Sequence, residues 1–490
     1  MKKILLMLAV LIASMGMHAE TVRRISLDEA IMLARSNSVD AAMALNELRS
    51  AYWEYRSYKA NFLPEVSFSA TVPSYNKSYS AYQQSDGSYT FVRNNNIGLN
   101  GELSITQNIW LTGGTLSINS SLDFLRQIDG NVGNRYMSVP VALTLNQPVF
   151  GVNTMKWNRK IEPLRYAEAK ANFLSETEGV ALLAVQYFFN LLEAREKVGI
   201  AKQNLANAEK LYEVALAKRK MGQISENDLL QIELNALTAR QALTSNESSK
   251  KNAMFQLRSF LDIEENAEIE PLMPEEIVLG EVNYEEVRSK AMYNNAHARS
   301  IRRRQLEADY EVAKAKGELR KINLFAQVGY TGTNNTLRSS YQGLKDNQVL
   351  EIGISIPLID WGKRKGRVKV AQSNREVVQS KLKKESIDFY QNLFILVERF
   401  NNQREQLELA QRADEIAQRR YNTNVQTFMI GKISTLDLND SQENKDAARQ
   451  EHINALFYYW YYYYQLRSIT LWDFANDWSI DADFEKLIKN

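Results

Sequence analysis

The chain carries the same turn motif twice, and this duplication limits the folds that it can adopt. GQISENDLLQ at 222–231 returns as GKISTLDLND at 431–440, a shift of 209 positions. In both copies a Gly interrupts a long helical pattern, an Ile and a Ser follow, and a new apolar-periodic stretch begins. Gly favours the left-handed conformation that ends a helix, and Ser is a favoured N-cap of the next one. The sequence therefore predicts two long helical hairpins.

Further landmarks extend the duplication over most of the chain. Pro148 and Pro357 keep the shift of 209, whereas 26–37 aligns with 283–294 at a shift of 257. The first copy therefore has about 48 more residues between its opening helix and its Pro. A long self-similarity at fixed spacing indicates a repeated architecture. In each copy we expect a helix, an extended region, a long helix, a turn and a second long helix.

The N-terminus has the form of an export signal. Lys2 and Lys3 precede the apolar stretch ILLMLAVLIA, and Ala19 offers a cleavage point. Such a stretch is too short to span a bilayer and is typical of a signal peptide, which is removed from the mature protein. We expect an exported chain.

The rest of the chain is divided by composition and by the repeat. Residues 259–287 contain no Lys or Arg and many acids, and Pro271 and Pro274 prevent a continuous helix there. We expect a solvated acidic connector between the two copies. The expected division is a signal peptide at 1–19, a first repeat at 20–262, the connector at 263–281, a second repeat at 282–470 and a C-terminal tail at 471–490.

Groups that carry chemistry are scarce in this chain. Cysteine is absent, and after the signal only His297 and His452 remain, far apart and without a motif. Gly431 and Lys432 lack the upstream Gly of a phosphate-binding loop. A formal net charge of +2 gives no reason to expect nucleic acid. The sequence therefore predicts no enzyme, no catalytic residue, no cofactor and no metal site.

Several segments alternate strictly between apolar and polar residues, as strands between two media do. They lie at 66–72, 97–109, 116–124, 139–147, 324–330 and 350–356. Between them, 73–96 is rich in Tyr, Asn and Ser and is expected to be a long loop, whereas 112–114 is a tight turn. Long loops on one side and tight turns on the other are typical of outer-membrane barrels. A soluble sandwich with one wet face is the alternative.

The helical segments are unusually long. Patterns at about 155–221 and 366–430 each cover about 65 residues, which corresponds to a length on the order of 100 Å. Large and small residues alternate along the first of them at coiled-coil spacing, so helix axes can approach closely. Such lengths suit a rod or a tube that crosses a compartment. The aromatic run at 458–464 is expected to pack against neighbouring helices.

Together these features resemble the TolC-type outer-membrane efflux proteins. The export signal, the two copies, the Pro after each strand region and G-x-I-S-x-x-D at both turns carry the resemblance, which covers about 25–470. It implies a mainly α fold with membrane β structure, in which a homotrimer shares one outer-membrane β-barrel continued by a long periplasmic helical barrel. It implies an exit duct that passes small molecules from a periplasmic adaptor protein and an inner-membrane pump to the exterior. A periplasmic coiled-coil scaffold without a pore is the alternative.

The resemblance also implies where partners and lipid lie. The strands contact outer-membrane lipid, and the hairpin turns form the periplasmic tip that contacts the adaptor. The tip residues are Gly222, Ile224, Ser225, Gly431 and Ser434. Ending one helix and capping the next is a structural role that these residues have in any case.

The resemblance further implies a gate at this tip. Asp437 and Asp440 match two acids that ring the narrowest point of the family's tunnel, and Asp228 matches in the first copy. Their alternative role is that of first-turn acids favoured by the helix dipole. The family's gate tyrosine and arginine fall on Phe428 and Ile433, so an apolar closure there is a further possibility.

The number of strands departs from the family. Each chain of the family usually contributes four strands to the barrel, whereas six alternating segments occur here. The surplus lies at about 97–124, within the extra residues of the first copy. This hairpin either enlarges the barrel or folds against it.

Overall fold

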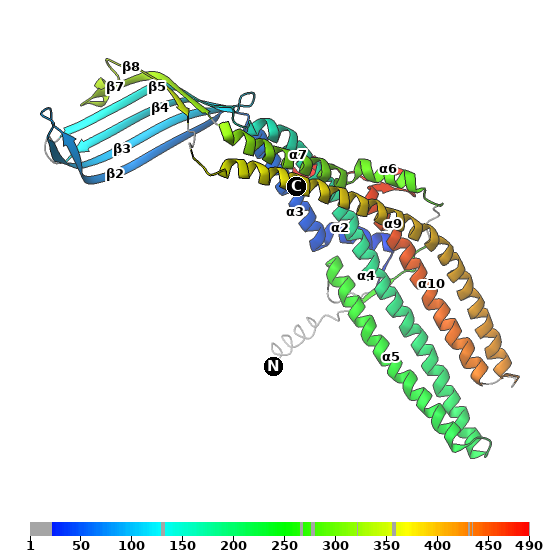
Figure 1. Cartoon of the computed structure of the whole chain (residues 1–490). Helices are drawn as coiled ribbons and strands as arrows, with labels where there is room; N and C mark the ends of the chain where they lie inside the picture. Colours follow the sequence, from blue (N-terminus) through cyan, green and yellow to red (C-terminus); the bar gives the residue numbers. More distant parts are fainter. Residues whose placement is uncertain are drawn as a thin grey trace, which may run out of the picture. The chain divides into compact units, whose positions relative to one another are not determined.

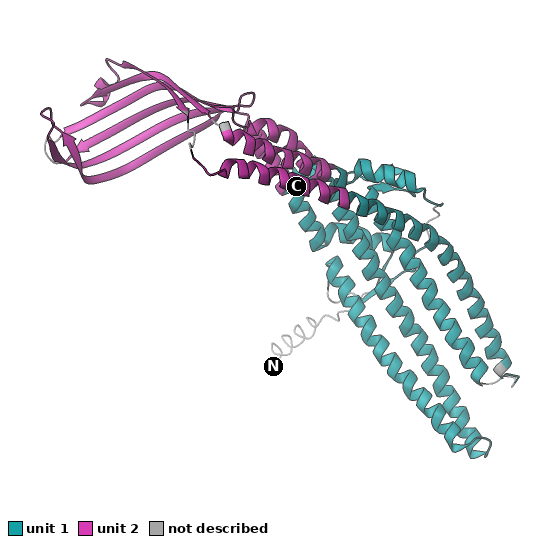
Figure 2. Cartoon of the chain, viewed as in Figure 1, with its two compact units in different colours: residues 1–49, 169–298, 386–490 teal, residues 50–168, 299–385 magenta. Residues whose placement is uncertain are grey.

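The computed structural model describes residues 22–128, 133–264, 268–275, 280–320, 322–354, 359–429, 432–433 and 435–489 (Figure 1). The expected signal peptide at 1–19 lies outside these residues. The chain divides into two compact units, which Figure 2 colours separately. We call the teal unit, residues 1–49, 169–298 and 386–490, the hairpin unit. The magenta unit, residues 50–168 and 299–385, is the sheet unit.

Within the described residues, six strands of the sheet unit form one antiparallel sheet in the order β2-β3-β4-β5-β7-β8 (Figure 1). Their bounds are β2 Glu65–Gln83, β3 Tyr89–Ile109, β4 Gly114–Gln127, β5 Gly133–Val149, β7 Ile322–Asn334 and β8 Lys345–Ile354. The short helix α8 (Leu337–Ser340) lies between β7 and β8. Each predicted alternating segment lies in one of these strands, as far as Ile354, where the described part of β8 ends.

The prediction of a long loop at 73–96 is wrong. β2 continues to Gln83, β3 begins at Tyr89, and these two residues pair directly. The turn between them is tight, since the Asp86 carboxylate accepts a hydrogen bond from the backbone N–H of Ser88 (3.0 Å) and Gly87 has a φ of +85°. Asp-Gly is a strong hairpin signal. The polar composition of the segment obscured that signal.

The extra residues of the first copy belong to the same sheet. β3 pairs with β2 along one side and with β4 along the other, and β4 in turn pairs with β5. The segment at about 97–124 therefore lies between β2 and β5 and separates them.

The helices reproduce the duplication residue by residue. α4 (Thr154–Lys220) and α9 (Lys363–Met429) each have 67 residues, and α5 (Glu226–Leu261) and α10 (Thr435–Thr470) each have 36. Every bound in the second copy lies 209 positions after its counterpart. The opening helices α2 (Leu27–Asn37) and α3 (Val39–Ala60) return as α6 (Tyr284–Asn294) and α7 (Ala296–Gly317), 257 positions later. No helix in the described part of the chain has an apolar stretch long enough to cross a membrane.

The core of the hairpin unit confirms the predicted role of the aromatic run at 458–464. Tyr459, Trp460, Tyr463 and Tyr464 are buried among α2, α4, α5, α6 and α9 residues. Tyr459 stacks on Phe400 with ring centroids 5.4 Å apart. The run is therefore a packing surface of α10.

The acidic connector is more structured than its composition suggests. β6 (Glu268–Pro271) pairs in parallel with β1 (Val22–Ile25), and Ile269 is buried. The Glu270 carboxylate accepts hydrogen bonds from Arg24 and Arg195. The expectation of a purely solvated segment is therefore wrong at these residues, because Ile269 is buried and Glu270 is paired with two arginines of the hairpin unit.

Short elements complete the chain. The 3-10 helix η1 (Glu318–Arg320) follows α7. After α10, β9 (Trp472–Asp473) pairs antiparallel with β10 (Trp478–Ser479), and α11 (Phe484–Lys489) follows. Phe484 packs edge-on against Phe173 of α4, with ring centroids 6.2 Å apart.

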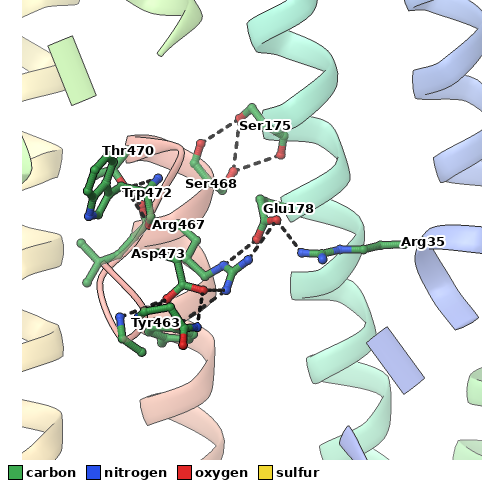
Figure 3. A network of polar contacts seen from close by, with 12 residues as sticks. Arg35, Ser175, Glu178, Tyr463, Arg467, Ser468, Thr470, Trp472 and Asp473 are labelled. Carbon is green, nitrogen blue, oxygen red and sulfur yellow. Dashed lines mark hydrogen bonds and ion pairs between the residues drawn. The ribbon is translucent and has the colours of Figure 1, made fainter. Parts of the chain in front are cut away.

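A buried network of charges joins this C-terminal segment to the rest of the hairpin unit (Figure 3). The Glu178 carboxylate of α4, whose side chain is 2% exposed, accepts hydrogen bonds from Arg35 of α2 and from Arg467 of α10. Arg467 also pairs with Asp473, which accepts a hydrogen bond of 2.6 Å from the Tyr463 hydroxyl. The network therefore connects α2, α4, α10 and the segment after α10.

The first prediction concerns the stability that this network provides. Replacing Arg467 with Met leaves the buried carboxylates of Glu178 and Asp473 without their shared partner. Breaking a buried ion pair commonly costs about 3–5 kcal/mol, because it leaves an uncompensated charge. We expect the free energy of unfolding to fall by about 3 kcal/mol, since Arg35 still pairs with Glu178. Denaturant unfolding of the purified protein in detergent, followed by tryptophan fluorescence, measures the change.

Arg24→Met is the matched control for Arg467→Met. The Arg24 side chain is 72% exposed and pairs with Glu270, so its loss should cost no more than about 1 kcal/mol. Equal losses in the two variants would contradict a stabilising buried network.

The second prediction concerns the pH dependence that Asp473 adds. Burial alone would raise the pKa of Asp473, but hydrogen bonds from Tyr463 and Asn476 and the charge of Arg467 outweigh it and lower the pKa below its ordinary value of 3.8. A lowered pKa contributes stability that is fully present above the unfolded pKa and is lost as pH falls through the folded pKa. Below pH 3.8, the melting temperature of the wild type should therefore fall more steeply than that of Asp473→Asn. Parallel melting curves in acid would show that Asp473 contributes nothing through its charge.

Candidate gate and docking site

The first hairpin turn is closed by backbone geometry. Gly222 has a φ of +72°, in the left-handed region that follows many helices. The N–H of Gln223 donates to the carbonyl of Lys218 and the N–H of Gly222 donates to the carbonyl of Arg219, both at 2.9 Å. These two bonds form a Schellman motif, which satisfies the last carbonyls of α4. The predicted role of Gly222 in ending the helix is confirmed.

Ser225 begins α5 as predicted. Its hydroxyl accepts a hydrogen bond of 3.1 Å from the Asp228 N–H, and the Asp228 carboxylate accepts one of 3.1 Å from the Ser225 N–H. The Ser225 hydroxyl, followed by its N–H, holds the pKa of Asp228 below its ordinary value by hydrogen bonding. Asp228 therefore serves as the second half of a capping box.

The second turn repeats this geometry as far as it is described. Gly431 and Ser434 lie outside the described residues. The N–H of Lys432 donates to the carbonyl of Thr427 at 3.1 Å, which is the bond from Gln223 to Lys218 shifted by 209 positions. The duplication therefore extends to the hydrogen bonding of the turns.

The two acids of the predicted gate lie at the start of α10. Asp437 is in the first turn of the helix and Asp440 is one turn later, and both are exposed. Asp440 forms an ion pair of 2.6 Å with Arg420 of α9 and accepts a hydrogen bond of 3.0 Å from Asn444. The backbone carbonyl of Asp437 accepts a hydrogen bond of 3.5 Å from Asn424. The acids therefore belong to contacts that hold α10 against α9.

Arg420 is a residue of this site that the sequence prediction missed. No local pattern marks it, because Arg420 lies 11 positions before Gly431 and outside the repeated turn motif. At the matching positions 209 residues earlier, the first hairpin has Leu211 and Gln231. The ion pair is thus specific to the second hairpin.

Phe428 and Ile433, which stand where the family has its gate tyrosine and arginine, are only partly described. Phe428 lies in the last turn of α9, and its side chain lies outside the described residues. Ile433 is half-buried in the turn. An apolar closure at these residues stays a prediction.

A groove of about 750 Å³ begins beside the first turn, between α4, α5 and α10. Small and amide-bearing side chains dominate its walls, and Ile224 lies at its end near the turn. Its lining includes Asn204, Asn207, Ala208, Asn235, Ala239 and Asn439. Such walls allow close approach of another helix and offer it hydrogen bonds. Nowhere in the described part of the chain, the groove included, is a group of three or more His, Cys, Asp or Glu side chains arranged to hold a metal ion.

Solved structures with the same fold are outer-membrane channels. The Campylobacter jejuni CmeC outer membrane channel superimposes with a TM-score of 0.67 at 16% identity, covering 94% of this chain and 88% of that one. The outer membrane protein VceC from Vibrio cholerae superimposes with a TM-score of 0.63 at 13% identity, covering 93% of this chain and 97% of that one. The open state of the Neisseria gonorrhoeae MtrE outer membrane channel gives 0.60 at 14% identity (93% and 90% covered). No curated protein sequence matches the chain.

A sequence profile of the outer membrane efflux protein family matches residues 30–261 and 292–462, well over half of the chain. The match includes both hairpin turns and all six strands of the sheet. With the shared fold, it confirms the predicted fold class of a β-barrel continued by a long helical barrel, the outer-membrane location extending into the periplasm, and the role as an exit duct. The chain therefore belongs to the outer membrane efflux protein family.

Proposed function

We propose that three copies of this chain form the duct and that their hairpin turns both dock a periplasmic adaptor and gate the tunnel. Channels of this family are trimers that work with adaptor proteins and inner-membrane pumps. The proposal assigns these partners, and outer-membrane lipid around the sheet, to this chain. It assigns no catalytic step to any residue.

The observation that carries the proposal is the side-by-side packing of the two hairpins within the hairpin unit. Asn204 of α4 donates a hydrogen bond of 2.9 Å to Asp446 of α10, and Asn207 donates one of 2.9 Å to the Tyr421 hydroxyl of α9. Arg449 of α10 contacts both Glu196 and Asp414. These contacts align α4, α9 and α10, so both turns lie at the same end of the unit (Figure 1). One partner can therefore contact both.

The groove between α4, α5 and α10 supports docking at this end. It opens beside the first turn and has room for side chains of a partner helix. Ile224 supplies an apolar contact, and the surrounding Asn side chains supply donors and acceptors. A helical hairpin of an adaptor fits these features better than a flat or strongly charged surface would.

The ion pair of the second hairpin supports a gate. The side chains of Arg420 and Asp440 are 50% and 56% exposed, and pairs of this kind contribute no more than about 1 kcal/mol. Adaptor binding can therefore supply enough free energy to separate α10 from α9 at this point. In a trimer, Asp437 and Asp440 would place six carboxylates around one opening.

The third prediction tests the acids at the constriction. Rings of carboxylates favour cations in pores and bind multivalent cations. In the double variant Asp437→Asn/Asp440→Asn, we expect the ratio of cation to anion permeability to fall by roughly twofold or more, with weaker block by trivalent cations. Conductance in planar bilayers measures both quantities.

Glu451→Gln is the control for the double variant, because Glu451 is an exposed acid about three turns further along α10. It should leave selectivity and block unchanged. Wild-type selectivity in the double variant, with trimers intact, would show that Asp437 and Asp440 only stabilise the start of a helix.

The fourth prediction tests docking at the first turn. Gly222→Val places a β-branched residue at a positive φ, which should destabilise the turn by about 1 kcal/mol or more. We expect weaker cross-linking to the adaptor and lower export. Site-specific photo-cross-linking from Gln223 and accumulation of an exported dye measure these effects.

Gly199→Ala is the matched control for Gly222→Val. Gly199 lies inside α4, a Cβ there meets no atom within 4 Å, and Ala favours helix. This variant should dock and export normally. If Gly222→Val also cross-links and exports normally, the first turn has no part in docking.

A further inference from the structure

Strand pairing gives the sheet one apolar and one polar face. The side chains of β3 and β4 follow this division in the same way as those of the other strands. On one face, Ile105 of β3 pairs with Val66 of β2 and with Ile118 of β4. On the other face, the Thr106 hydroxyl lies 3.1 Å from the Ser117 hydroxyl. Asn100 donates a hydrogen bond of 2.6 Å to Asp123 on the same polar face. The extra hairpin thus separates two media in register with its neighbours.

The apolar face continues across the whole sheet. Leu143 of β5 pairs with Ile118 and with Val328 of β7, and Ala326 of β7 pairs with Leu350 of β8. Each strand places an exposed apolar side chain on this face. One from each strand, in sheet order, is Phe68 (72% exposed), Leu103 (46%), Ile118 (44%), Leu143 (46%), Val328 (56%) and Leu350 (73%). A continuous apolar face of this kind requires an apolar medium against it.

The two outer strands of the sheet each have one unpaired side. Among the described residues, β2 pairs with β3 alone and β8 pairs with β7 alone. Unpaired backbone groups are not tolerated against hydrocarbon, so a lipid-facing sheet must continue until it closes. The sheet has an even number of antiparallel strands, so β2 and β8 run in opposite directions. When β8 of one chain lies beside β2 of the next chain, the antiparallel pattern therefore continues.

We propose that β3 and β4 form part of the lipid-facing wall of the shared barrel. We further propose that β8 of each chain pairs with β2 of the neighbouring chain, which closes a barrel of 18 strands. The number rests on the trimer of the proposed function and on the six-stranded sheet of one chain. Barrels of about eight strands are filled by their own side chains, whereas those of 16–18 strands leave an aqueous channel. The polar face, with Glu65, Glu102, Asp123 and Glu351, then lines water.

The alternative is a barrel built without β3 and β4, with these strands packed outside it. The pairing argues against it, because β2 and β5 are not paired with each other: β2 pairs with β3, and β5 pairs with β4 on the side away from β7. Packing the hairpin outside would break both sets of pairs.

Cysteine accessibility tests the wall assignment, since the chain has no cysteine of its own. Single variants Ser117→Cys and Asn119→Cys on the polar face of β4 should react with a small charged thiol reagent in intact outer membranes. Leu116→Cys and Ile118→Cys on the apolar face should not react. Equal labelling of all four positions would place β4 outside the wall and overturn the proposal.

A control on β2 separates this result from failure of the barrel itself. Ser67→Cys should react and Phe68→Cys should not, whether the wall has β4 or lacks it. If the β2 pair also labels equally, the sheet is not a membrane wall and the proposed function fails together with the inference. If only the β4 positions label equally, the inference alone fails.

Intermolecular cross-linking and direct imaging test the closure. Ser69→Cys on β2, combined in turn with Asn347→Cys, Val349→Cys or Glu351→Cys on β8, should give covalent trimers on denaturing gels for at least one pair. Electron cryomicroscopy of the wild-type protein in lipid should show 18 strands around one opening. A wall of any other number of strands, or cross-linked species that stop at dimers, would overturn the proposal.

Discussion

Each strand of the sheet lies between two media, and the rest of the structure follows from that constraint. The alternation along the strands serves lipid on one side and water on the other, and their backbone groups must be paired because hydrocarbon offers no partner. In a single chain, the backbone groups are paired within the sheet, but the outer sides of β2 and β8 have no neighbouring strand among the described residues. The fold of a single chain is therefore incomplete. Association in the membrane is a condition of the fold.

Much of this fold could be predicted from the sequence, because its signals are local and strong. The turn motif, the helical period and the strand alternation each occupy a short window, and the duplication confirmed each signal twice. The bounds of α4 and α9 are related by the shift of 209 to the residue. The loop expected at 73–96 failed because composition was weighed above the Asp86-Gly87 turn signal.

Partners far apart in sequence could not be predicted in the same way. Glu178 is balanced by Arg35 and Arg467, which are 143 and 289 positions away. No periodicity marks Glu178 as buried, and a lone Glu in a long helix is ordinarily a solvated residue. At the candidate gate, the acids were found and Arg420 was not, because the acids fall in a repeated motif and Arg420 does not. Burial and pairing are properties of the packed unit and have no local pattern.

The two kinds of ion pair in the hairpin unit differ in strength in a way that suits a gated duct. The Glu178 carboxylate is almost inaccessible to water, so loss of its partner Arg467 leaves a buried charge and costs several kcal/mol. The pair between Arg420 and Asp440 is more than half exposed at its carboxylate, and water replaces the lost contact at little cost. The first hairpin has Leu211 and Gln231 at these positions, and a different exposed ion pair, between Arg240 and Glu209, joins its two helices. A partner binding at the second turn can therefore separate α10 from α9 at low cost, while the buried network around Glu178 keeps the other ends of α4 and α10 together.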